Sequence, residues 1–546
     1  MNRPAWCSCS RRQWLVRVCS LLLGVGAAVG FAADAPPGFK HRGFYLHEGW
    51  LFKHPFAVRS WTREDFAAMY QLLARLGFDR VMNWPMFESI SAPLSATDAQ
   101  ALRDYRQTID DAHAAGLEFW LAQCANLTPP PSIAARPWKE RNPYPVWKHV
   151  RLDDPAEAAA YFAHRRAMME IVNTADAYVT IDGDPGGCAG AQPQAWLDVF
   201  RADRATLDAC GKAAARQPVI PWVWCGWGTE KVWGGDPNNP PERIAPFVKA
   251  SLETLAAGMP EPWLLLPGRS IRENWANGRV NIALAEEVGL IPRSTLLLYE
   301  AIEYEPSIPG SNLQFADIRR MLRDEAGHAA AADGVFGNAQ QPVMVLPNLY
   351  FFARAAADLS YLDTPDEEVL GDLADLLGGP RELLVPAWRC LELPLDRLPA
   401  DLPDRLRKAT LLGEAGRFIP GGARRYLDIL AAEVESRRGF LGAIAKPAGA
   451  SAESSDEAAA SLAAATRALV GWWKMHGYVN AGDERTPFSW GFVRKADVAA
   501  LREWATANVS DRDAVIAAAA TALASSQTLG EGEAAKRLAE VIGAKK

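Results

Sequence analysis

Short apolar runs alternate with amphipathic segments over most of the first two thirds of the chain. Each run has the length and composition of a buried strand. Gly, Pro and polar residues follow most of these runs, as expected where a buried strand ends. The eight predicted strands are 42–47, 80–83, 117–122, 177–181, 219–224, 263–266, 295–299 and 334–338.

The segments that separate these strands have helical periodicity. In 62–76, for example, Phe66, Met69 and Leu73 lie on one face of the predicted helix. The other predicted helices are 98–115, 155–173, 193–212, 243–257, 272–288, 315–326 and 343–359. A helix after each strand favours parallel pairing, because a parallel connection needs a crossover. The pattern therefore predicts the α/β class and a (β/α)8 TIM barrel. An open, doubly wound sheet is the alternative, but no GxGxxG or GxxxxGK[ST] motif supports it.

Beyond residue 360 the periodicity is helical throughout, with an Ala-, Ser- and Gly-rich connection at 446–456. The predicted helices are 366–377, 403–412, 423–437, 457–473, 495–508 and 511–524. We therefore expect a targeting segment at 1–35, a barrel domain at 36–360 and a helical C-terminal region at 361–546.

Active sites of TIM barrels lie at the carboxyl ends of the strands. In this chain those ends combine acidic, amide and aromatic side chains. Such a mixture suits a sugar, because rings stack on its C–H faces and polar groups bond its hydroxyls. The candidate substrate-binding residues are His47, Asn83, Trp84, Asn126, Trp222, Trp224, Arg269, Tyr299 and Asn338.

Two pairs of acidic residues at the strand ends are candidate catalytic groups. Asp182 and Asp184 follow the fourth predicted strand, and Glu300 and Glu303 follow the seventh. Cleavage of a glycosidic bond needs one carboxyl as acid and another as base or nucleophile. In extended backbone Asp182 and Asp184 point to one side, and their repulsion would raise the pKa of one of them, as a general acid requires.

Each of these residues also has a structural interpretation. Asp182 and Asp184 lie in a Gly- and Pro-rich turn, where carboxylates often bond backbone amides. The glutamates could be solvated loop charges. Trp222 and Trp224 could belong to the core of the barrel, and Arg269 could form a structural ion pair.

Composition excludes several classes of protein. The net charge is −7 without a basic block, so we expect no nucleic-acid partner. The chain has neither a CxxC nor an HExxH motif, and its eight histidines are scattered, so we expect no metal and no cofactor.

The 20 tryptophans fit a large core with a minority in a binding site. Five cysteines follow the targeting segment, and this odd number does not indicate a disulfide scaffold.

The N-terminus has the features of an export signal. Arg11, Arg12 and Arg17 precede the apolar run 18–31, which small residues follow at 32–35. The stretch from Ser10 to Leu15 resembles a twin-arginine signal, and Sec export is the alternative. No later stretch is apolar enough to span a bilayer, so we expect a periplasmic or secreted protein that leaves the membrane when it matures.

Three stretches near the end of the predicted barrel resemble one enzyme family. Gly334–Asn338, Asn348–Ala356 and Asp363–Val369 are similar to the end of the barrel in bacterial α-glucuronidases. The Asp184–Gly187 loop resembles their strand-four loop, which carries the general acid. The likeness covers about residues 40–400. Two features differ from that family, which usually has a further N-terminal α/β domain and a glutamate as the acid.

The resemblance implies an inverting hydrolysis with Asp184 as acid and a strand-seven carboxylate as base. The related retaining hexosaminidases use two neighbouring strand-four acids, which Asp182 and Asp184 could match.

These observations together favour an exported glycoside hydrolase that acts on the terminal sugars of an oligosaccharide or polysaccharide fragment. Arg269 would bind the carboxylate if the sugar is a uronic acid. A barrel that binds glycans without cleaving them is the main alternative. A metal-dependent hydrolase is disfavoured, because the first strand carries no pair of histidines. The sequence leaves open the sugar, the linkage, the stereochemistry and the oligomeric state.

Overall fold

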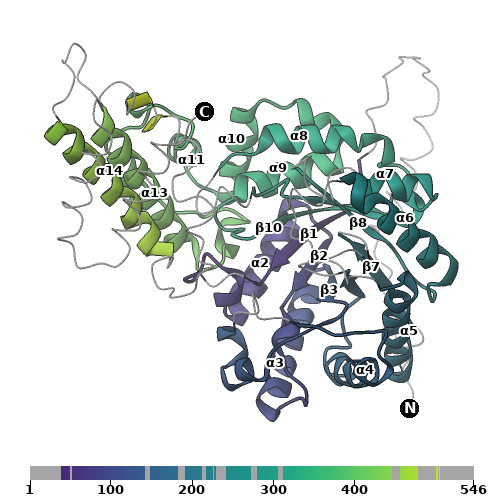
Figure 1. Ribbon diagram of the computed structural model, residues 1–546. Helices are drawn as coiled ribbons and strands as arrows, with labels where there is room; N and C mark the ends of the chain where they lie inside the picture. Colours follow the sequence, from purple (N-terminus) through teal and green to yellow (C-terminus); the bar gives the residue numbers. More distant parts are fainter. Residues whose placement is uncertain are drawn as a thin grey trace, which may run out of the picture. The chain divides into compact units, whose positions relative to one another are not determined.

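Eight parallel strands close into one barrel in the computed structural model, with helices around them (Figure 1). The order around the barrel is β1-β10-β9-β8-β7-β6-β3-β2. The strands are β1 (His41–His47), β2 (Arg80–Trp84), β3 (Glu118–Cys124), β6 (Ala177–Ile181), β7 (Val219–Val223), β8 (Leu266–Ser270), β9 (Thr295–Tyr299) and β10 (Gly334–Ala339). The predicted (β/α)8 TIM barrel is confirmed.

The structure describes residues 38–49, 52–141, 148–182, 191–211, 217–224, 227–228, 241–271, 280–304, 312–445, 455–476, 500–501 and 503–504. All of them belong to one compact unit, Pro36–Lys546. The predicted export signal, Asp184 and nearly all of the last two predicted helices lie outside the described residues. The limits of the three predicted domains stay predictions.

A helix follows each barrel strand, and a small antiparallel sheet of β4 (Leu127–Thr128) and β5 (Lys148–His149) precedes one of them. The helices are α2 (Arg63–Leu76), α3 (Ala96–Ala114), α4 (Pro155–Met169), α5 (Pro193–Ala209), α6 (Pro241–Gly258), α7 (Val280–Glu287), α8 (Phe315–Asp324) and α9 (Leu346–Ala357). The first of them begins at a capping box, in which the Thr62 hydroxyl accepts from the Asp65 amide and the Asp65 carboxylate accepts from the Thr62 amide.

The sixth barrel strand lies further along the chain than the sequence predicts. We expected 263–266, and β8 spans Leu266–Ser270. Pro267 and Gly268 are poor strand residues, so the local pattern predicts that the strand ends at the position where β8 begins. Closure of the barrel overrides this preference, because Gly268 and Ser270 pair with Leu297 and Tyr299 of β9.

Side chains of the barrel strands alternate between two apolar cores. Tyr45, Met82 and Trp120 belong to a cluster inside the barrel. Phe44 and Val81, one position away, pack instead in the larger core between the strands and the helices. Position within a strand therefore decides whether a polar residue faces the interior of the barrel or the helices around it.

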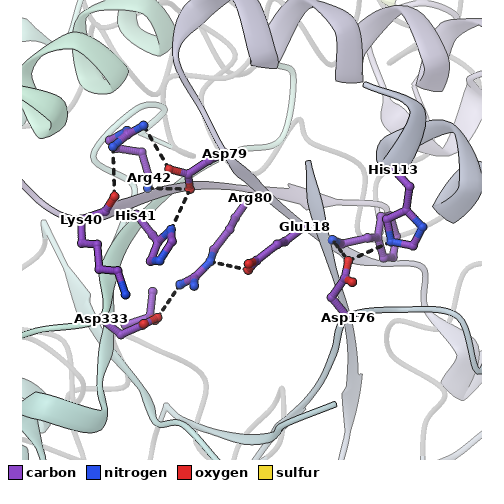
Figure 2. Close-up of polar contacts among 11 residues, drawn as sticks. Lys40, His41, Arg42, Asp79, Arg80, His113, Glu118, Asp176 and Asp333 are labelled. Carbon is purple, nitrogen blue, oxygen red and sulfur yellow. Dashed lines mark hydrogen bonds and ion pairs between the residues drawn. The ribbon is translucent and has the colours of Figure 1, made fainter. Parts of the chain in front are cut away.

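Ion pairs link the amino-terminal ends of β2, β3 and β10 (Figure 2). The Arg80 guanidinium lies 5.0 Å above the Trp120 ring and pairs with Glu118 and Asp333. Burial alone would raise the pKa of Asp333, but hydrogen bonds from Arg80 and the Thr295 hydroxyl hold it below its usual value. Polar contacts at this end of a TIM barrel contribute to stability, whereas the catalytic residues lie at the opposite end.

The described part of the C-terminal region is helical, as predicted. It contains α10 (Asp366–Leu377), α11 (Arg381–Trp388), α12 (Leu402–Lys408), α13 (Ala423–Ile444) and α14 (Ser455–His476). The sequence did not predict α11, which is short and contains Pro386. No described helix has both the length and the apolar character that a membrane crossing requires.

Candidate functional site

Five predicted residues form a row of rings across the carboxyl-terminal end of the barrel. The centroid distances are 5.1 Å for His47–Trp84, 6.1 Å for Trp84–Trp222, 6.0 Å for Trp222–Trp224 and 4.7 Å for Trp224–Tyr299. All five side chains are buried, and Trp224 and Tyr299 are the most exposed at 6% and 7%. Trp222 and Trp224 thus belong to the interior core and also lie at the end where TIM barrels carry their active sites.

Glu300 directly follows β9 and is fully buried. Its φ of 63° lies in the left-handed region, which costs a non-glycine residue about 1–3 kcal/mol. The Asn338 Oδ1 atom accepts a hydrogen bond from the Glu300 amide at 2.6 Å. The Ser270 hydroxyl donates to the Glu300 carboxylate at 3.2 Å. Side chains on β8 and β10 therefore hold this carboxylate in place, and backbone strain of this kind clusters at functional sites.

The second glutamate of the same loop has a different environment. One oxygen of the Glu303 carboxylate accepts hydrogen bonds from the backbone amides of Gln340 and Gln341, the second at 2.8 Å. These contacts fix the loop that follows β10. They favour a structural role for Glu303.

Asp182 lies at the end of β6 and is fully buried. Its carboxylate accepts a hydrogen bond from the Trp224 amide at 3.1 Å. This contact ties the ends of β6 and β7 together. Its predicted partner Asp184 follows two residues later, outside the described residues.

Two predicted substrate-binding residues face the helices instead of the barrel interior. The Asn83 Nδ2 atom lies 3.1 Å from the Glu48 carboxylate and 3.1 Å and 3.0 Å from the hydroxyls of Tyr70 and Tyr105. The Arg269 guanidinium pairs with Asp324, at 2.5 Å, and with Glu325, both at the end of α8. The structure favours the ion-pair interpretation of Arg269.

The predicted residue Asn126 lies on the loop that carries β4. Its Nδ2 atom donates to the Val150 carbonyl at 3.2 Å. It is buried beside the antiparallel pair β4–β5, and this contact anchors the loop after β3.

Two buried glutamates at the same end of the barrel, Glu48 and Glu88, were not among the predicted site residues. Burial raises the pKa of Glu48 to about 7, although hydrogen bonds from Tyr105 and Asn83 and the charge of Arg59 oppose the shift. Burial also raises the pKa of Glu88, whose carboxylate accepts from the Trp84 indole at 3.1 Å and from the Cys124 amide. A signal was present, because Glu48 directly follows a predicted strand and Glu88 lies five residues beyond one.

Next to Glu48, the predicted residue His47 is neutral. Burial and the nearby Arg59 charge lower the pKa of His47 to about 3. Its Nδ1 atom accepts from the Gly49 amide at 3.1 Å. At neutral pH this imidazole therefore offers a polar but uncharged edge.

Metal binding has no support in the described part of the chain. The His, Cys, Asp and Glu side chains there form no group of three or more that could hold an ion. The buried acids described above bond to amides, hydroxyls and indoles instead.

No family model and no curated protein matches the chain. Among solved structures, CpGH84B has a TM-score of 0.45 at 10% identity, over 81% of this chain and 73% of that one. An O-GlcNAc hydrolase of Thermobaculum terrenum has a TM-score of 0.41 at 11% identity, over 92% of this chain and 94% of that one. A GH138 enzyme targeting pectin rhamnogalacturonan II has a TM-score of 0.42 at 10% identity, over 80% of this chain and 62% of that one. Similarity this low assigns neither a family nor an activity.

Proposed function

We propose that the protein is a glycoside hydrolase that removes terminal sugars from an oligosaccharide by carboxyl acid/base catalysis. The observation that carries the proposal is Glu300. It is a fully buried carboxylate in left-handed backbone at the end of a barrel strand, bonded to Ser270 and adjacent in sequence to Tyr299 of the aromatic row.

Glu300 would serve as base or nucleophile. Its carboxylate is held by a side-chain hydroxyl, and its backbone is fixed through Asn338. Such positioning keeps a reactive group in the geometry that the reaction needs. Glu303 suits this role less well, because its carboxylate caps two backbone amides.

Asp184 would serve as the general acid that protonates the leaving oxygen. The Asp182 carboxyl is held in place by a hydrogen bond from the Trp224 amide. Repulsion between the carboxyls of Asp182 and Asp184 would raise the pKa of one of them, as the role of a general acid requires. The alternative, in which Asp182 and Asp184 act as a pair in a retaining reaction, uses the same two carboxyls in other roles.

Asp184→Asn tests the assignment of the acid. The variant keeps the size of the side chain and removes the proton donor, so turnover of oligosaccharides should fall on the order of 10²- to 10⁴-fold. The loss should be smaller for an aryl glycoside whose leaving group needs no protonation. Asp153→Asn, which changes an exposed aspartate on the loop before α4, is the matched control.

A correctly folded Asp184→Asn protein with the same turnover of oligosaccharides as the Asp153→Asn protein would show that Asp184 is not the acid. A chain that binds oligosaccharides but hydrolyses none would favour the glycan-binding alternative instead.

A further inference from the structure

Two buried N–H groups inside the barrel have no hydrogen-bond partner within the part of the chain that the structure describes. They are Nε1 of Trp222 on β7 and Nδ2 of Asn338 on β10. Trp222 is 1% exposed and Asn338 is fully buried. Buried polar atoms in native proteins almost always have a partner, so each exception needs an explanation.

The identity of the free atom on Asn338 follows from its other contact. The Glu300 backbone N–H lies 2.6 Å from the Asn338 side chain and can only donate. The atom that it meets must therefore be the amide oxygen, which leaves the amide nitrogen as the unpartnered donor. One end of Asn338 thus fixes Glu300, and the other end is available.

Tyr45 links the two donors. Its ring packs edge-on against Trp222, with centroids 5.2 Å apart, and its backbone lies opposite Asn338 in the pairing of β1 with β10. Gly268 lies close to the same indole, and both tryptophan rings of β7 pack against it so closely that a side chain there would crowd them. A Cβ atom there would lie 3.4 Å from Trp222 Nε1 and 3.1 Å from the Trp224 ring.

We propose that Trp222 Nε1 and Asn338 Nδ2 form a subsite that binds neutral oxygen atoms of the substrate, namely the hydroxyls of an uncharged sugar, beside Glu300. The inference deepens the proposed function and rests on it for the role of Glu300. A hydroxyl oxygen can accept from either donor and can itself donate to a carboxylate.

The charges at this end of the barrel favour a neutral sugar over a uronic acid. Glu300 and Asp182 are buried acidic side chains there, and a third carboxyl group on the substrate would make it costlier for any of the three to be charged. The Arg269 guanidinium, the cation that would have received it, already pairs with Asp324 and Glu325.

Trp222→Phe tests the subsite, because it keeps a ring in the core and removes the N–H. Trp196→Phe is the matched control. Trp196, on α5, has an equally buried and unpartnered indole N–H, but it stacks on Trp227 in the outer core, with centroids 6.0 Å apart. Asn338→Asp is the second variant, since it keeps an acceptor for the Glu300 amide and removes the donor.

The readout is binding measured by calorimetry, with methyl glycosides of glucose, galactose, mannose and xylose and with methyl glucuronide as probes. We expect a neutral glycoside to bind more tightly than the glucuronide. Affinity for it should fall roughly 10-fold in Trp222→Phe and in Asn338→Asp, the effect of one lost hydrogen bond, and stay unchanged in Trp196→Phe. The loss in Trp222→Phe should disappear for a deoxy analogue that lacks the bound hydroxyl.

Equal affinity in the Trp222→Phe and Trp196→Phe proteins, tighter binding of the glucuronide, or no binding of any neutral probe would each overturn the inference. Because the readout is binding, a chain that hydrolyses nothing but shows the expected pattern would refute the proposed hydrolysis and leave the subsite standing.

Discussion

At the scale of single residues, Glu300 shows what the sequence contains and what it lacks. Its place after a predicted strand identifies it as a candidate. Its left-handed backbone and its bonds to Ser270 and Asn338 depend on the register of three strands, which are far apart in the sequence. Local pattern does not encode that register, so the supporting residue Ser270 could not be predicted.

Asn83 shows why the sequence predicts the end of the barrel at which a residue lies but not the side of the strand that it occupies. Strands of a parallel barrel are buried on both faces, so their sequences do not alternate between apolar and polar residues. Met82 and Trp84 belong to the interior cluster, and Asn83 between them meets Tyr70 and Tyr105 on the outer side.

Glu48 should make the stability of the fold depend on pH. Its pKa is about 7 in the folded protein against 4.5 for an exposed glutamate. Between these values the folded state holds a proton that the unfolded state has lost, so stability falls as pH rises. By about pH 8 this loss should be on the order of 3 kcal/mol. Glu48→Gln keeps an acceptor for Tyr105 and Asn83 and should remove the loss.

Urea unfolding at about pH 5 and about pH 8 measures this effect. The free energy of unfolding should differ less between the two pH values in Glu48→Gln than in the unmodified protein. Glu253→Gln, a change on the exposed face of α6, should retain the full difference. An identical pH dependence in the Glu48→Gln and Glu253→Gln proteins would contradict the prediction.

At the scale of secondary-structure elements, hydrophobic periodicity predicted nearly every helix and strand of the barrel. It failed where closure of the barrel decides the outcome. The segment Leu266–Ser270 contains Pro and Gly and becomes a strand because β7 and β9 lie on either side of it. Conversely, Trp263 and Leu265 have strand-like character but form only isolated bridges.

Arg80 links the amino-terminal ends of β2, β3 and β10 through its ion pairs with Glu118 and Asp333. Arg80→Met would leave the partly buried Asp333 without this ion-pair partner (Figure 2). It would also remove the contact with the Trp120 ring. We expect a loss of about 1–3 kcal/mol, below that of a fully buried pair because Glu118 is half exposed.

Chemical denaturation compares this variant with Arg103→Met, which removes an exposed arginine on α3. The Arg103→Met protein should unfold at the same urea concentration as the unmodified chain, and the Arg80→Met protein at a lower one. Equal midpoints for the two variants would show that the ion pairs at this end do not stabilise the barrel.

At the scale of the whole molecule, the succession of elements predicts a barrel and a helical region, but it does not predict how they are joined. The structure joins them at Asp65, which caps α2 and also accepts a hydrogen bond from the Gly421 amide at 2.7 Å. Phe56 packs against Trp472 and His476 of α14. Such contacts link positions hundreds of residues apart, so the local hydrophobic pattern does not predict them.

Hydrolysis of aryl glycosides by the purified chain tests the central claim most directly. The panel contains 4-nitrophenyl glycosides of neutral hexoses, xylose, N-acetylglucosamine and glucuronic acid, and turnover is compared among the unmodified chain, Glu300→Gln and the exposed control Glu253→Gln. We predict that at least one glycoside is hydrolysed and that folded Glu300→Gln loses on the order of 10²- to 10⁴-fold in rate, while Glu253→Gln loses nothing. Failure to hydrolyse any glycoside, or a Glu300→Gln protein as active as the unmodified chain, would contradict the account.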